Sequence, residues 1–241
     1  SANIDTIPTV KLKSLVTLNL GYNNLKDFPD LNSFNANSNT LKNVYLSHNK
    51  FYLAENSSER KLNTAIVNKI PAGISNLQLG STFYGSIDAN VFSRFTSIQN
   101  FSLYRGYGPY FHPDGINANT PIPNVAHTCT SYNIQSNDFR SIASSSGNNK
   151  NVKELENVTN INLYGNYYLS DGGNFSISNN NTVITDLNIS STNLNIPVLA
   201  NKSSLVTVNA THSRGAAGLF SGNTYKLNNC TSLVNLYLYA A

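Results

Sequence analysis

The 241-residue sequence lacks methionine and tryptophan, has only two cysteines, and is poor in charge. Two cysteines exclude a small scaffold built from disulfides, and we interpret both Cys129 and Cys230 as buried free thiols. Charged residues make up 12% of the chain, about half of the usual share, so uncharged side chains must supply most of the surface polarity. The net charge of +4 is scattered along the chain and does not by itself indicate a nucleic-acid partner.

Long apolar runs are also missing. No stretch reaches the roughly 18 residues that a membrane-spanning helix needs, so we expect no membrane insertion. The sequence has no signal peptide and no initiator methionine, and residues 1–13 read as the second half of an earlier repeat. We therefore expect a fragment of a longer chain, with an unusual N-terminal cap as the alternative.

The chain is rich in hydrophobic residues, at 40%, and in asparagine, which occupies about 40 positions. A weakly charged chain with this many aliphatic and tyrosine residues can bury enough apolar area to fold. We expect an ordered chain whose polar surface consists mainly of Asn, Ser, Thr and Tyr.

An internal repeat organises these residues. The segment from Leu15 to Leu25 reads L-x-x-L-x-L-x-x-N-x-L, and residues 41–51, 129–139 and 158–168 repeat the pattern with conservative changes. Weaker copies begin at Ile74, Ile98, Ile184, Leu205 and Leu233. The nine starts are 21 to 33 residues apart, mostly within or near the 20–29 residues of known repeats.

This pattern resembles the leucine-rich-repeat family over essentially the whole chain. The resemblance implies one α/β-type repeat solenoid over residues 1–241, mostly β: a horseshoe with a parallel concave sheet and an irregular or 3₁₀ convex side. It also implies that the repeated Asn hydrogen-bonds neighbouring backbone. Thr82, Thr192 and Ser213 replace that Asn and can do so only partly, so we expect those repeats to be looser. The rival fold is a parallel β-helix, which the irregular segments between the copies disfavour.

The repeat predicts that three columns of nine side chains face outward on the concave sheet, two, four and six positions after the first Leu of each copy. Only Asp186 is charged among these 27 positions, so the face is a poor nucleic-acid site and suits a neutral glycan or a polar protein surface. The alternative is that these are simply solvated strand residues. From this face we select as candidate ligand-binding residues Tyr45, Gln78, Asn133, Asn162, Asn188, Asn209 and Tyr237.

A second candidate region is the segment YRGYGPYFHPDG, where the repeat loses its Asn and a long insertion follows. Aromatic rings with Arg on a loop are frequent contact sites, although such rings can also cover an exposed part of the core. We expect binding by this loop and by tyrosines two repeats away, roughly 10 Å distant. The residues selected here are Tyr104, Arg105, Tyr107, Tyr110, His112, Tyr164 and Tyr167.

No constellation typical of catalysis is evident in the sequence. Hydrolysis of a glycoside needs two nearby carboxylates, whereas the predicted face carries only Asp186. His48 and His212 occupy the same slot but lie six repeats apart, about 29 Å, which is too far to share a metal ion. We expect no enzyme activity, no metal and no cofactor.

These observations predict a binding module that contacts a protein or a neutral glycan within a larger exposed protein. We expect an extracellular, cell-surface or virion-surface location. The alternative is a structural component of a phage virion or a similar assembly, contacting other subunits, because the composition is similar to that of phage fibre proteins.

Overall fold

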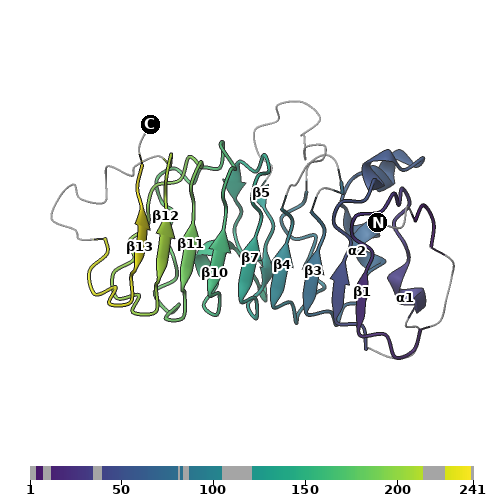
Figure 1. Ribbon diagram of the computed structural model, residues 1–241, viewed down its shortest axis with the longest axis horizontal. Coiled ribbons are helices and arrows are strands. Elements are labelled where there is room, and N and C mark those ends of the chain that lie inside the picture. The colour runs from purple at the N-terminus through teal and green to yellow at the C-terminus, as the bar shows by residue number, and fades with distance from the viewer. Residues whose placement is uncertain are drawn as a thin grey trace.

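The computed structural model describes residues 4–7, 12–34, 40–80, 82–83, 87–104, 121–213 and 226–239. Its main element is one sheet of nine short parallel strands, which follow one another in chain order along the long axis of the molecule (Figure 1). The strands are β1 (Thr17–Asn19), β2 (Asn43–Tyr45), β3 (Asn76–Gln78), β4 (Asn100–Ser102), β7 (Ser131–Asn133), β10 (Asn160–Asn162), β11 (Asp186–Asn188), β12 (Thr207–Asn209) and β13 (Asn235–Tyr237). The predicted parallel sheet is therefore confirmed.

The middle residue of each strand points into the core. Leu18 pairs with Val44 and Val44 with Leu77, and the same register continues to the last strand. The complete column is Leu18, Val44, Leu77, Phe101, Tyr132, Ile161, Leu187, Val208 and Leu236. Seven of these nine side chains are buried, the exceptions being the two in the outermost strands, β1 and β13. Because side chains alternate along a strand, the residues on either side of this column face outward.

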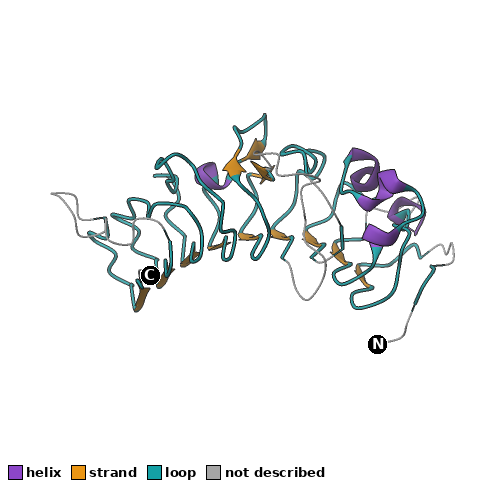
Figure 2. Ribbon diagram, turned by 90° about the horizontal axis from the view of Figure 1, so that it is seen from above, coloured by secondary structure: helices purple, strands orange, loops and turns teal. Residues whose placement is uncertain are grey.

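The connecting segments contain little regular structure. They include two short α-helices, α1 (Leu31–Phe34) and α2 (Thr64–Asn68), and three 3₁₀ helices, η1 (Phe51–Leu53), η2 (Ser57–Arg60) and η3 (Val152–Glu154). Figure 2 shows the strands of the main sheet on the inner side of a shallow arc and the connecting segments on the outer side. The expectation of a mostly β, solenoid-like chain is confirmed. Among the described residues, no helix is both long and apolar enough to cross a membrane.

Two additional small sheets lie on the outer side of the middle turns. Strand β5 (Pro121–Ile122) pairs with β8 (Ser141–Ile142) in parallel, and β6 (Val125–Ala126) pairs with β9 (Asn149–Lys150) in antiparallel orientation. These strands are confined to residues 121–150 and do not continue along the described part of the chain.

A buried asparagine connects each well-matched turn to the turn before it. The Asn49 side chain is 1% exposed, and its Nδ2 donates to the carbonyls of Leu46, in its own turn, and Leu20, in the preceding one, at 2.9 and 2.8 Å. Its Oδ1 accepts from the backbone N–H of Leu25 at 3.2 Å. The two-carbonyl arrangement recurs at Asn137, with Ile134 and Leu103, and at Asn166, with Leu163 and Ile134. The expected asparagine ladder is present.

The turns that have Thr or Ser in place of the ladder asparagine keep only one of its two hydrogen bonds to carbonyl groups. The hydroxyl of Thr192 donates to the Ile189 carbonyl at 2.6 Å, and that of Ser213 donates to the Ala210 carbonyl at 2.7 Å. Both acceptors lie in the same turn as the hydroxyl. Neither hydroxyl bonds the preceding turn among the described residues, because one short side chain cannot reach both carbonyls.

This difference predicts the stability of two variants. Asn166→Ala should lower the free energy of unfolding by about 2–4 kcal/mol, because it removes three hydrogen bonds and leaves the Leu163 carbonyl without its side-chain donor. Asn166→Thr should lower it by roughly half as much, because the hydroxyl can keep the bond within the turn. Urea unfolding followed by circular dichroism measures both values. The exposed Asn180→Ala is the control, and an Asn166→Ala loss no larger than the control would contradict the role of the ladder.

Candidate binding face

The outward side chains of the nine strands form two columns that run the length of the sheet, as the repeat predicted. The first column contains Thr17, Asn43, Asn76, Asn100, Ser131, Asn160, Asp186, Thr207 and Asn235. The second contains Asn19, Tyr45, Gln78, Ser102, Asn133, Asn162, Asn188, Asn209 and Tyr237. Only Asp186 is charged in these columns, which together we call the binding face.

Amides of the first column bond one another. Asn43 Nδ2 donates to Thr17 Oγ1 at 2.8 Å, Asn76 donates to Asn43, and Asn100 donates to Asn76. Near the other end, Asn160 Nδ2 donates to the Asp186 carboxylate at 2.9 Å. These amides are therefore partly satisfied by their neighbours and are held in fixed orientations.

Asparagines of the second column bond their own backbone. Asn133 Oδ1 accepts from the backbone N–H two residues later at 3.1 Å, which is an Asx turn. Asn19, Asn162, Asn188 and Asn209 accept equivalent bonds at 3.1–3.2 Å. Four of the predicted ligand-binding residues therefore have a folding role, in which the side-chain oxygen helps the chain turn away from the sheet.

Three consecutive strands depart from this pattern. The second column holds Tyr45, Gln78 and Ser102 in β2, β3 and β4, and none of these side chains makes a hydrogen bond within the described part of the chain. They line a shallow hollow of about 290 Å³, which we call the face hollow. Its outward-column lining is Tyr45, Asn76, Gln78, Asn100, Ser102, Ser131 and Asn133. The face hollow thus brings together three predicted site residues, Tyr45, Gln78 and Asn133.

The other predicted face residues lie along the same column but outside the hollow. Asn162, Asn188 and Asn209 are half-buried, whereas Tyr237 is exposed. In the third predicted column, Ser47 and Ser190 are buried, whereas Tyr164 and Tyr239 are exposed. This column is therefore only partly accessible.

The predicted aromatic loop is only partly described. Arg105, Tyr107, Tyr110 and His112 lie outside the described residues. Tyr164 and Tyr167 are exposed, at 40% and 64%. Tyr104 is half-buried, and its described ring contact is to His48 rather than to either of those tyrosines.

Sequence reasoning missed the cluster around His48. The His48 ring stacks on Tyr22 at 4.2 Å between centroids, and its Nε2 lies 3.1 Å from the Tyr104 hydroxyl. Tyr22 and His48 both have left-handed backbone, with φ of 58° and 61°. No residue type signalled this conformation, which Gly and Asn usually adopt. The same slot is left-handed at Ser136, Gly165, Ser191 and His212, so the left-handed turn belongs to the repeat.

Burial affects the titration of this cluster. Desolvation lowers the pKa of the His48 imidazole below its ordinary value. Desolvation also raises the pKa of the Tyr104 hydroxyl, and its interaction with Tyr22 raises it further. Both shifts favour the neutral forms of the His48 and Tyr104 side chains.

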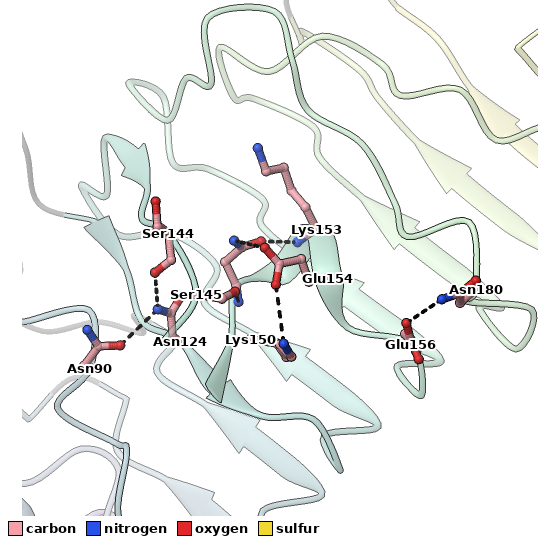
Figure 3. Close-up of polar contacts among 10 residues, drawn as sticks. Asn90, Asn124, Ser144, Ser145, Lys150, Lys153, Glu154, Glu156 and Asn180 are labelled. Carbon is pink, nitrogen blue, oxygen red and sulfur yellow. Dashed lines mark hydrogen bonds and ion pairs between the residues drawn. The ribbon is translucent and has the colours of Figure 1, made fainter. Parts of the chain in front are cut away.

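Charge gathers instead on the outer side of the molecule, beside a hollow of about 460 Å³. Figure 3 shows Lys150 beside the Glu154 carboxylate, 3.9 Å away, and Asn180 donating to Glu156 at 2.8 Å. Lys153 pairs with Asp171 at 2.8 Å. The Lys150–Glu154 pair lies within one segment, whereas the other two contacts join successive outer segments. These charged groups are therefore already engaged in contacts within the fold.

The two cysteines differ in their surroundings. Cys129 is completely buried, and burial raises the pKa of its thiol to about 12. Cys230 is half-buried, and its Sγ donates to the Leu199 carbonyl at 3.0 Å. Both are free, and the expectation of a fully buried thiol is confirmed for Cys129 only.

Neither the known protein-family models nor the curated protein sequences contain a match to this chain.

The His48 cluster predicts a pH dependence of stability. A histidine with a lowered pKa in the folded state binds protons more weakly there than in the unfolded chain. Acidification below about pH 6.5 therefore destabilises the fold, and the effect is absent above about pH 7.5. His48→Gln should lose less stability than the wild type between about pH 7.5 and 5, as measured by the midpoint of thermal unfolding.

His212→Gln, in the same slot of a distant turn, controls for the loss of an imidazole. If the wild type and His48→Gln lose the same number of degrees over this range, His48 is not the group responsible.

Proposed function

We propose that this chain is a leucine-rich-repeat solenoid that acts as a non-enzymatic recognition module. It contacts a neutral protein or glycan through the binding face, as part of a larger extracellular, cell-surface or virion-surface protein. Three features support the proposed membership of the leucine-rich-repeat family. They are the repeated L-x-x-L-x-L pattern, the buried ladder asparagine, and the position of the main sheet on the inner side of an arc.

The polarity of the face supports a neutral partner. Among the eighteen residues of the two outward columns, only Asp186 is charged, and its carboxylate already accepts hydrogen bonds from Asn160 and Thr185. Such a surface gains little from long-range electrostatic attraction, so its affinity must come from hydrogen bonds and ring contacts. The observation that carries the proposal is the face hollow, where the polar groups of Tyr45, Gln78 and Ser102 are not used by the fold.

An array that carries neutral oligosaccharides, anionic oligosaccharides and uncharged peptides tests this proposal. The double variant Tyr164→Glu/Tyr237→Glu adds two charges to exposed sites on the sheet side, outside the face hollow. It should weaken binding to a neutral probe at least about ten-fold, because each carboxylate must be desolvated without a partner. The control Leu53→Glu/Val198→Glu adds the same charge to exposed sites on the connecting segments.

Equal binding by both double variants would contradict recognition through this face. Retention of anionic probes alone would contradict a neutral partner. If the wild-type chain retains no neutral probe, the recognition role fails.

The second candidate is an architectural role in a phage virion or a similar assembly, where the solenoid packs against other subunits. The observation that favours it is the exposure of large side chains in and beside β13: Val234 at 76%, Tyr237 at 51% and Tyr239 at 63%. A map of the intact particle distinguishes the two roles. Architecture predicts a binding face covered by partner subunits, and recognition predicts one that is open to solvent.

A further inference from the structure

The face hollow lies where the second column stops serving the fold. Five of the nine positions in this column are asparagines that close an Asx turn. The three consecutive departures, Tyr45, Gln78 and Ser102, all line the face hollow. Positions at which a repeat abandons its structural residue without a visible gain for the fold are those where function is expected.

The face hollow contains hydrogen-bonding groups that have no partner. Ser102 Oγ is buried and has no hydrogen-bond partner within the described residues. A buried hydroxyl without a partner is unfavourable, and a change of the χ1 rotamer can turn it toward the hollow. The Gln78 amide makes no hydrogen bond within the described residues. Asn133 uses its oxygen for the Asx turn, which leaves its Nδ2 as a donor.

The first-column wall and the strand backbone of the face hollow are fixed by other contacts. Asn76 donates to Asn43 and accepts from Asn100, so the first-column side is locked by its own amide ladder. The four strands that carry the hollow, β2, β3, β4 and β7, are neighbours in the interior of the sheet. A site whose lining is already ordered loses little conformational entropy when it binds a ligand.

We infer that the face hollow binds one uncharged sugar ring, a neutral pyranose; this inference rests on the proposed recognition function of the face. The volume of about 290 Å³ lies at the lower limit of small-molecule sites and suits a single ring. The hydroxyl and amide groups of the lining both donate and accept, which matches the hydroxyl groups of a sugar. Tyr45 adds an aromatic ring at one side, which can pack against the C–H face of a pyranose.

The chemistry of the lining argues against other occupants. None of its residues is charged, so an anionic sugar or a phosphate would meet no cation there. An extended peptide usually pairs with a free sheet edge, whereas the four strands here have neighbours on both sides. A folded protein partner would need about 800 Å² of surface, far more than this hollow provides.

Titrations with methyl glycosides test the inference. The probes are the methyl glycosides of glucose, galactose, mannose and N-acetylglucosamine, with glucuronic acid as the anionic comparison, and saturation-transfer NMR measures binding. At least one neutral probe should bind the full chain with a dissociation constant on the order of 1 mM. Glucuronic acid should bind at least about five-fold more weakly, because no cation compensates its desolvation.

Variants locate the site. Tyr45→Ala and Gln78→Ala should each weaken binding at least about five-fold, because each removes a ring contact or a hydrogen-bonding group. Matched controls are Tyr168→Ala and Gln99→Ala, which remove the same residue types outside the face hollow and should bind like the wild type. Ser102→Ala should weaken binding while the unfolding midpoint stays equal or rises, because the hydroxyl has no partner in the fold.

Two outcomes overturn the sugar site: no neutral glycoside binds the wild type in the millimolar range, or the hollow variants bind like their matched controls. When either outcome occurs and Tyr164→Glu/Tyr237→Glu still weakens binding of a neutral array probe, only the sugar site fails and recognition through the face stands. If glycosides bind in the face hollow but the double variant still binds the array probe, the sugar site stands and recognition through the rest of the binding face is contradicted.

Discussion

The architecture depends on one interaction, the buried asparagine amide that bonds a carbonyl of its own turn and one of the turn before. Asn49, Asn137 and Asn166 each make this pair of bonds in an apolar interior. Because the amide reaches both carbonyls only when two turns are aligned, it favours the register that stacks the core column. Where Thr192 or Ser213 replaces it, core packing and the backbone bonds of the sheet maintain the alignment.

The register in turn determines what the binding face can offer. Most of its asparagines are occupied, either by amide neighbours in the first column or by the Asx turns of the second. An asparagine-rich surface is therefore not by itself a ligand site. The proposed recognition therefore rests on β2–β4, where the polar groups of Tyr45, Gln78 and Ser102 line the face hollow without a partner in the fold. The proposed neutral partner and the proposed sugar ring both follow from this division of roles.

The sequence predicted the sheet and both outward columns because side-chain alternation and the Leu pattern together determine which residues align. It did not separate side-chain amides that serve the fold from those that are available, because the Asx turn of Asn188 and the unbonded amide of Gln78 cannot be distinguished without the backbone. It also missed the Tyr22–His48–Tyr104 cluster, since no residue type signalled the left-handed turn that aligns these rings. The breaks in the second column at Tyr45, Gln78 and Ser102 were the signal available for the hollow.

Disulfide trapping tests most directly the claim that successive turns align these residues side by side. Gln78 and Ser102 pair across β3 and β4, where adjacent strands are about 4.8 Å apart, a separation that a disulfide can span. Gln78→Cys/Ser102→Cys should form an internal disulfide under mild oxidation, located by mass spectrometry. Gln78→Cys/Phe101→Cys should not form one, because Phe101 points into the core. The reverse result would mean a register shifted by one residue, and the face hollow would not exist.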